Sequence, residues 1–251
     1  MAMEQLDYLN DWATRLRELG RFVDQPRYMT PLNRDEQLAR FLDAWDAGGG
    51  FNPRFEYEPL PHAVIDEVKR AREELEVGGI WTGHVADDLD QTILELTSLV
   101  DRRPAAITDA TVNAHGEVAE DVVAEADRIL DEPAPEAEAI VLDAPAAAAS
   151  LREALESVGR EEWRVTTERP IQAEMSVSNA NREVRVRPGA RFSAKAVRRL
   201  LVHEIGTHVF RNENGSRQPL RLLGVGLVGY TATEEGMAAY NEERFGVSSP
   251  V

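Results

Sequence analysis

Two histidines and a glutamate lie close together in the stretch HEIGTH, as His203, Glu204 and His208. Imidazole nitrogens and carboxylate oxygens are the ligands that Zn²⁺ accepts where thiolates are unavailable, and the sequence contains no cysteine. A glutamate beside the first histidine is placed to take a proton from metal-bound water. The stretch therefore favours a zinc site in which His203 and His208 are ligands and Glu204 is the general base.

The spacing HExxxH is one residue longer than the familiar HExxH. Around a regular α-helix, residues i and i+4 lie about 40° apart, whereas residues i and i+5 lie about 140° apart. Both imidazoles can reach one ion only if this part of the helix has a wider turn, such as a π-bulge. Gly206 lies inside the segment, where it makes such backbone strain easiest to tolerate. We predict a local distortion at Ile205 to Thr207.

A third ligand is expected from the adjacent carboxylates Glu234 and Glu235, in the stretch TEEGMA at 233–238. They stand at the predicted start of the next helix. The preceding stretch NENGSRQPL at 212–220 contains turn-forming residues and is predicted to be the connecting loop. A glutamate from the following helix with a water in the fourth position is the arrangement of gluzincin peptidases. Residue types and spacing leave the choice between the two glutamates open.

The same histidines and glutamates also have an interpretation in which they bind no metal. Two histidines on one helix can be ordinary partly buried side chains, and a pair of glutamates at a helix start often only complements the helix dipole. A short motif alone is a weak signal, so a metal-free helical protein stays a possible alternative.

The elements around these residues predict an α+β fold. A mostly helical N-terminal part is followed by a gluzincin-like catalytic part that has a small antiparallel sheet and two zinc-binding helices. Helical periodicity or composition predicts helices at 5–19, 35–47, 62–77, 87–100, 109–130, 144–158 and from the N-cap Ser193 onward, with an extended connector at 51–61. Strands are expected at 163–168, 171–177 and 183–187. The stretch DEPAPEAE at 131–138 reads as an exposed linker and predicts a division into a helical N-terminal region, 1–138, and a catalytic region, 139–251.

Composition narrows the classes of partner. The net charge of −17 and pI near 4.8 argue against binding to nucleic acid or to a membrane surface, because both need clustered cations. Lys69 and Lys195 are the only lysines, and acidic residues are spread along the chain, which is typical of a halophilic protein; an acidic mesophilic protein is the alternative. No N-terminal signal and no apolar run of about 20 residues is present, so we expect a cytoplasmic protein.

Three stretches together resemble the microtubule-associated tyrosine carboxypeptidase family: HEIGTHVFR at 203–211, NGSRQPL at 214–220 and TEEGMA at 233–238. Prokaryotic relatives carry a QEGLA motif at the third stretch, and NPRFEY at 52–57 is similar to an upstream family feature. The resemblance implies a zinc metallopeptidase that removes a C-terminal residue from a peptide or protein. It implies His203, His208 and Glu235 as ligands and Glu204 as the base. Glu234 stands at the glutamine of QEGLA, which places it behind the ligands or in solvent.

The resemblance leaves two other functions open. Relatives continue with a further helical region after the third ligand, so part of the substrate pocket could be missing or supplied by a partner. A zinc-binding regulatory or peptide-binding protein without turnover is therefore the main alternative, and a hydrolase of another amide or ester is the second. The oligomeric state and the preferred terminal residue stay undetermined.

Substrate binding adds three weaker expectations. An extended peptide could add as a strand to the edge of the predicted sheet. A carboxypeptidase also needs a cation for the terminal carboxylate, and the nearest in sequence are Arg211, Arg217 and Arg221, each expected to be an ordinary surface arginine. Tyr230 and Tyr240 are candidates for stabilising an oxyanion, although packing is the simpler role for both.

Overall fold

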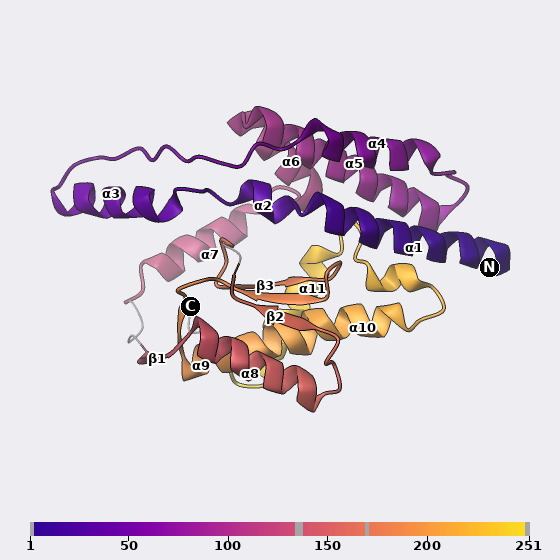
Figure 1. Cartoon of the computed structure of the whole chain (residues 1–251). Coiled ribbons are helices and arrows are strands. Elements are labelled where there is room, and N and C mark those ends of the chain that lie inside the picture. The colour runs from indigo at the N-terminus through magenta and orange to yellow at the C-terminus, as the bar shows by residue number, and fades with distance from the viewer. Residues whose placement is uncertain (1–2, 134–137, 169–170, 249–251) are drawn as a thin grey trace.

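The N-terminal part of the protein is helical. The structure, a computed structural model, describes residues 3–133, 138–168 and 171–248, so residues 134–137 of the expected linker lie outside the described part. Seven helices precede the first strand in the described chain: α1 (Met3–Val23), α2 (Gln25–Met29), α3 (Arg34–Asp46), α4 (His62–Glu74), α5 (Ile80–Asp101), α6 (Pro104–His115) and α7 (Glu120–Leu130) (Figure 1). Residues 51–61 have no regular secondary structure, which confirms the extended connector.

Three helices form the first hydrophobic core. Apolar residues of α1 recur every three or four positions, so Leu9, Leu16 and Leu19 fall on one buried face that packs against α4 and α5. The expected helix at 109–130 is wrong as a single element. It is divided into α6 and α7 at Gly116, whose φ of 78° is a left-handed conformation that ends a helix.

Two small sheets follow. β1 (Ile140–Asp143) pairs antiparallel with β5 (Arg191–Ser193), while β2 (Arg164–Thr166), β4 (Glu183–Val186) and β3 (Met175–Ser178) form a three-stranded sheet in the order β2-β4-β3. β3 and β4 are antiparallel, but β2 and β4 are parallel, so the prediction of an antiparallel sheet is only partly correct. The reason is that the chain passes from β2 to the edge strand β3 and then returns between them as β4.

The second hydrophobic core lies on one face of this sheet. Val184 and Val186 of β4 pack with Leu151 and Leu155 of α8 (Ala144–Ser157). Leu220 and Leu222, by contrast, belong to the core of the N-terminal helices. The division at residue 138 stays a prediction, since the C-terminal part contributes to both cores.

The chemical residues lie on the last helices. Ser193 caps α9 (Ala194–Leu200) by accepting a hydrogen bond from the backbone of Ala196 at 2.9 Å, as predicted. The chain continues through the π-helix η1 (Leu201–Val209) into α10 (Phe210–Ser216), then the 3₁₀ turn η2 (Arg221–Gly224) and α11 (Thr231–Arg244). The loop expected at 212–220 therefore starts later, after α10 ends at Ser216.

Two glycines allow α10 and η2 to pack backbone to backbone. A Cβ atom at Gly215 would lie 2.2 Å from the carbonyl oxygen of Leu223, and one at Gly224 would lie 2.3 Å from Ser216 Oγ.

The described residues contain no helix long and apolar enough to cross a membrane. The architecture is thus a mostly helical α+β fold with small sheets.

Candidate metal centre

The predicted distortion of the histidine helix is present and is wider than expected. Residues Leu201–Val209 form a π-helix, which includes the predicted Ile205 to Thr207. A π-helix closes its hydrogen bonds from i to i+5, so residues five apart return to one face. The ring centroids of His203 and His208 lie 5.0 Å apart. The hydroxyl of Thr207 also donates to the carbonyl of Val202, five residues earlier, at 3.3 Å.

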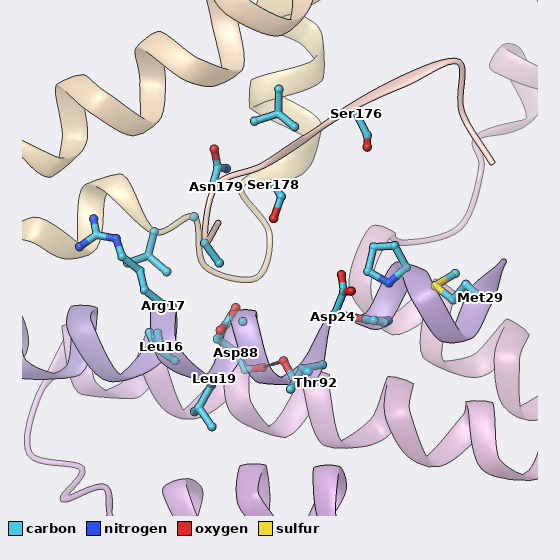
Figure 2. A pocket seen from close by; sticks show the side chains of 18 of the residues that line it. Leu16, Arg17, Leu19, Asp24, Met29, Asp88, Thr92, Ser176, Ser178 and Asn179 are labelled. Atoms are coloured by element: carbon cyan, nitrogen blue, oxygen red, sulfur yellow. Dashed lines mark hydrogen bonds between the residues drawn. The ribbon is translucent and has the colours of Figure 1, made fainter. Parts of the chain in front are cut away.

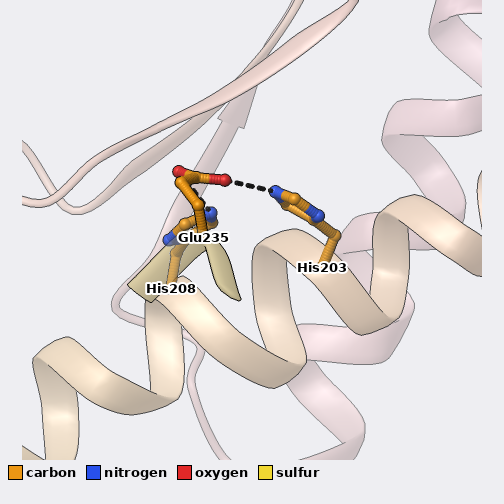
Figure 3. Close-up of side chains that lie close together, drawn as sticks. All are labelled: His203, His208 and Glu235. Atoms are coloured by element: carbon orange, nitrogen blue, oxygen red, sulfur yellow. Dashed lines mark ion pairs between the residues drawn. The ribbon is translucent and has the colours of Figure 1, made fainter. Parts of the chain in front are cut away.

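Glu235 on α11 faces both imidazoles (Figure 3). Its Oε2 lies 3.4 Å from His203 Nε2, and its Oε1 lies 3.6 Å from His208 Nε2. One ligand atom from each of the three residues lies within 4.8 Å of the others. Zn²⁺ binds nitrogen and oxygen at about 2.0–2.2 Å, which places tetrahedral ligands roughly 3.3–3.6 Å apart. Both contacts of Glu235 match this spacing, so the three side chains suit a tetrahedral divalent ion.

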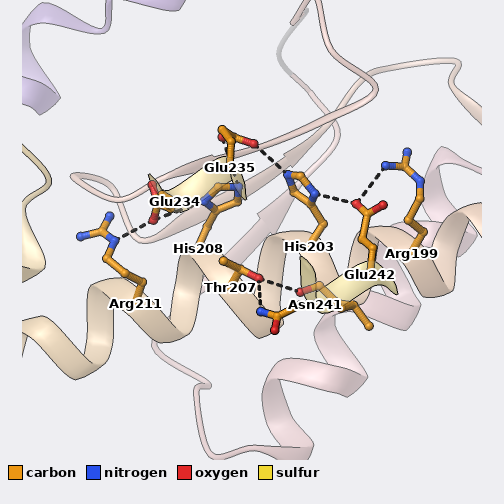
Figure 4. Close-up of polar contacts among 10 residues, drawn as sticks. Arg199, His203, Thr207, His208, Arg211, Glu234, Glu235, Asn241 and Glu242 are labelled. Atoms are coloured by element: carbon orange, nitrogen blue, oxygen red, sulfur yellow. Dashed lines mark hydrogen bonds and ion pairs between the residues drawn. The ribbon is translucent and has the colours of Figure 1, made fainter. Parts of the chain in front are cut away.

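Each histidine is also held from behind by a carboxylate of α11 (Figure 4). His203 Nδ1 lies 2.7 Å from Glu242 Oε1, and His208 Nδ1 lies 3.3 Å from Glu234 Oε1. With Nδ1 bound in this way, both imidazoles present Nε2 to Glu235, which is the usual role of carboxylates behind metal-binding histidines.

Arginines neutralise the two supporting carboxylates. Arg199 Nη1 lies 3.2 Å from Glu242 Oε1, and Arg211 Nε donates to Glu234 Oε1 at 2.6 Å. Burial by itself would raise the pKa of Glu234, but hydrogen bonds from His208 and Arg211 outweigh it, so the net pKa is lowered. Glu234 is ionised behind His208, consistent with the position that the sequence resemblance implies.

Glu242 was not identified from the sequence, although a signal was available. It follows Glu235 by seven residues, which is two turns of α11, so both side chains project from one face of that helix. Counting turns from the expected ligand would have selected it.

Glu204 lies in the first turn of the π-helix and is only 6% exposed. Burial raises the pKa of its carboxyl, and the nearby imidazoles of His208 and His203 oppose that effect. The carboxyl is thus close enough to the histidine pair for their charges to act on it. Its role as a base stays a prediction.

Three expectations for the neighbouring side chains have different outcomes. Arg217 and Arg221 are exposed, as expected, but Arg211 is wrongly expected to be a surface residue. Its guanidinium is mostly buried, donates to Glu234 and to the carbonyl of Gly224, and lies over the ring of Tyr230 at 5.1 Å. The reason is that Arg211 follows His208 by three residues on one continuous helix, so both side chains lie on the face that meets Glu234 of α11.

The two tyrosines also differ. Burial and then the charge of Glu234 raise the pKa of Tyr230 to about 12, so its hydroxyl stays protonated at neutral pH. Tyr240 is 58% exposed and lies at the surface of α11. Tyr230 is therefore the tyrosine that borders the metal centre, through its contact with Glu234.

Comparison with known proteins adds one finding. The model of the family described as microtubule-associated tyrosine carboxypeptidase matches residues 41–250, which is most of the chain. Searches of curated proteins and of solved structures found no match. The matched region contains all the residues of the candidate metal centre.

Proposed function

Since the chain belongs to the microtubule-associated tyrosine carboxypeptidase family, a family of hydrolases, we propose that it is a zinc metallopeptidase that removes a C-terminal residue from a peptide or protein. His203, His208 and Glu235 would hold the ion, in a gluzincin-like arrangement. The observation that carries the proposal is the π-helix, because it brings two histidines five residues apart to one face, opposite Glu235.

The donor set supports zinc as the metal. Two imidazole nitrogens and one carboxylate oxygen leave a fourth position open, which is the pattern of catalytic rather than structural zinc sites. An ion bound there would lower the pKa of a coordinated water and polarise the scissile carbonyl. The supporting Glu242 and Glu234 would keep both imidazoles oriented during turnover.

Glu204 would act as the general base. It is adjacent to His203 in sequence, and its carboxyl is buried beside both imidazoles. In the proposed reaction it accepts a proton from the attacking water and returns that proton to the leaving amine. The burial of Glu204 excludes bulk solvent that would compete for this proton.

A peptide could be held at the outer edge of β3. One edge of β3 pairs with β4, and the other edge has no strand partner among the described residues. β3 also contacts the π-helix, so a substrate strand added there would lie beside the metal centre. Of the three arginines considered for the terminal carboxylate, only Arg211 reaches this centre, where it is already bound to Glu234.

The proposal is tested with the variant Glu204→Gln, which keeps the shape of the side chain but cannot accept the proton. Elemental analysis of the purified wild type and variant should find about one zinc per chain in both, while cleavage of peptide C-termini should be lost in the variant. Unchanged turnover in the variant would reject Glu204 as the base. Zinc in the wild type without cleavage of any peptide in a library would support the regulatory alternative instead.

A further inference from the structure

Two helices of the N-terminal part contribute to neither hydrophobic core. α3 buries only Gln37, and α7 buries none of its residues. Helices shorter than about 12–15 residues are marginal in water by themselves, and most of their stability comes from packing an apolar face. With 13 and 11 residues, α3 and α7 therefore need a surface to pack against. Figure 1 shows both helices toward the end of the molecule opposite the start of α1.

Each of these helices carries an apolar stripe that faces solvent. The α3 stripe has the spacing i, i+3, i+4 and i+7 and consists of Leu38, Phe41, Leu42 and Trp45, which are 39–69% exposed. The α7 stripe consists of Val122, Val123, Ala126, Ile129 and Leu130, of which the two valines and Leu130 are 48–81% exposed. In an ordinary surface helix such a stripe faces the core. Here both stripes lack that cover in the described chain.

No cavity of the same chain makes use of the two stripes. A cavity of about 530 Å³ lies between the N-terminal helices and β3 (Figure 2), and Asp88 of α5 is among the residues that line it. None of its lining residues belongs to α3 or α7. The stripes are therefore outer surfaces, and their cover has to come from another molecule.

The area of the two stripes matches what one partner supplies to a stable interface. A large apolar side chain presents roughly 150–250 Å² when it is fully exposed, so the seven exposed residues of the stripes leave roughly 800 Å² in contact with water. One partner of a standard protein–protein interface buries about the same area, about 800 Å². Both stripes together are thus sufficient for a stable complex, whereas either one alone provides only about half of that area.

The two stripes also complement each other in side-chain size. The α3 stripe has the aromatic rings of Phe41 and Trp45, while the α7 stripe has two valines and Ala126. Large side chains of one helix fit between small ones of another when helices pack ridges into grooves. A second copy related by a two-fold axis offers an α7 stripe to the α3 stripe and an α3 stripe to the α7 stripe. It covers both at once, which a single foreign helix does not.

We propose that the chain forms a two-fold symmetric dimer in which the α3 stripe of each copy packs on the α7 stripe of the other. The inference is independent of the proposed peptidase function, because neither helix contains a residue of the candidate metal centre. It adds an interaction surface on the opposite part of the chain from the histidine helix in sequence.

Charge makes this dimer dependent on salt. α3 has four acidic residues and two arginines, a net charge of −2, and α7 has four acidic residues and one arginine, a net charge of −3. The whole chain has a net charge of −17, so two copies repel each other at low ionic strength. Salt screens that repulsion and leaves the apolar contact in place. The dimer should therefore tighten as salt is added, whereas binding of a basic foreign partner would weaken.

The first test is the mass of the full chain in solution, measured by sedimentation velocity and light scattering over a wide range of protein concentration. The dimer has twice the chain mass of 27.9 kDa. Its dissociation constant should fall between about 0.1 M and about 1 M NaCl, where the screening length shortens from about 10 Å to about 3 Å. A monomer at every concentration and salt overturns the proposal and assigns the stripes to a different partner.

The second test places a charge in each stripe. Trp45→Glu and Val122→Glu should each raise the dissociation constant of the dimer about thirtyfold or more, as expected for residues at the centre of an interface. Ile80→Glu and Val77→Glu are the matched controls, since their side chains are 74% and 56% exposed, against 69% for Trp45 and 57% for Val122. Both controls lie at the start of α5, outside the stripes, and should dimerise as the wild type does.

A mixture of the two variants tests the pairing of α3 with α7. In a dimer of Trp45→Glu with Val122→Glu, one helix contact contains both charges and the other is wild type, so the mixture should dimerise more tightly than either variant alone. Pairing of α3 with α3 would leave no wild-type contact in the mixture. The proposal is overturned if mixing restores nothing, or if either variant dimerises as the wild type does. Equal melting temperatures, measured where the wild type is monomeric, show that the variants are folded.

Discussion

Removing the carboxylate behind His203 should weaken zinc binding strongly. In Glu242→Ala, His203 Nδ1 loses an acceptor at 2.7 Å, and Arg199 loses its partner at 3.2 Å. A hydrogen bond to a charged group contributes about 1.5–3 kcal/mol, and every 1.4 kcal/mol is tenfold in affinity. We therefore expect zinc to bind about 10–100-fold more weakly, within the range seen for partners of metal-binding histidines.

A conservative variant separates charge from hydrogen bonding. Glu242→Gln keeps an acceptor for His203 but removes the negative charge, so only about 1 kcal/mol, or roughly fivefold in affinity, should be lost. The control is Glu243→Gln, which makes the same change of charge at the next, exposed residue. It should bind zinc as the wild type does.

The dissociation constants are measured by competition with a chromophoric chelator at one fixed pH and ionic strength. Thermal unfolding with and without excess zinc gives a second readout, because a ligand stabilises the folded state in proportion to the logarithm of its affinity. A tenfold loss of affinity reduces that stabilisation by about 1.4 kcal/mol. Wild-type affinity in Glu242→Ala, or an equal loss in Glu243→Gln, would refute the reasoning.

Further predictions concern the helix, the cavity and the packing. Deleting Gly206 restores an i, i+4 spacing of the two histidines that a regular helix accepts, so zinc should still bind. Inserting one alanine after Gly206 should abolish zinc binding. Chelator competition measures the zinc affinity of both variants. Burial raises the pKa of Asp88 from 3.8 to about 7, so the folded state keeps a proton that the unfolded chain has lost, and stability falls as the pH rises from about 4 to about 7. Asp88→Asn, which keeps the acceptor for Val228 N at 2.8 Å, should be about 1–3 kcal/mol more stable than the wild type above pH ~7 in urea unfolding, with the gain vanishing below pH ~4; a gain independent of pH would contradict this. Gly215→Ala should cost about 1–3 kcal/mol, because its Cβ would overlap Leu223, while Gly83→Ala in open space on α5 should gain about 0.5–1 kcal/mol.

The arrangement of the candidate metal centre was largely predictable because its geometry follows from local rules. Two histidines five residues apart cannot share an ion on a regular helix, so the widened turn at Gly206 followed from the ligand set itself. The preference for Glu235 over Glu234 came from the family resemblance, and the structure brings Glu235 to the imidazoles. Glu242 follows Glu235 by two turns of α11, so its place beside His203 could also have been predicted from helix periodicity.

Features that depend on distant contacts were not predictable in the same way. β4 is parallel to β2 because the chain first forms β3 and then returns between the two, and the composition of the strands does not predict that order. The break at Gly116, by contrast, had a local signal, because glycine is the residue that most often follows the end of a helix. The cavity combines residues 16–30, 88–92 and 171–180, so no single stretch of sequence contains its signal.

Helix α1 has a practical consequence for anyone who produces shortened versions of this protein. The family match begins at residue 41, but Leu9 and Leu16 of α1 share a core with Leu222, and Asn10 exchanges hydrogen bonds with the backbone of Pro219 and Arg221 at 2.9 and 2.8 Å. A fragment trimmed to the matching region would uncover apolar surface beneath η2 and would aggregate. Inactivity of such a fragment would result from its loss of solubility and would not test the catalytic residues. Shortened versions of the protein should therefore retain α1.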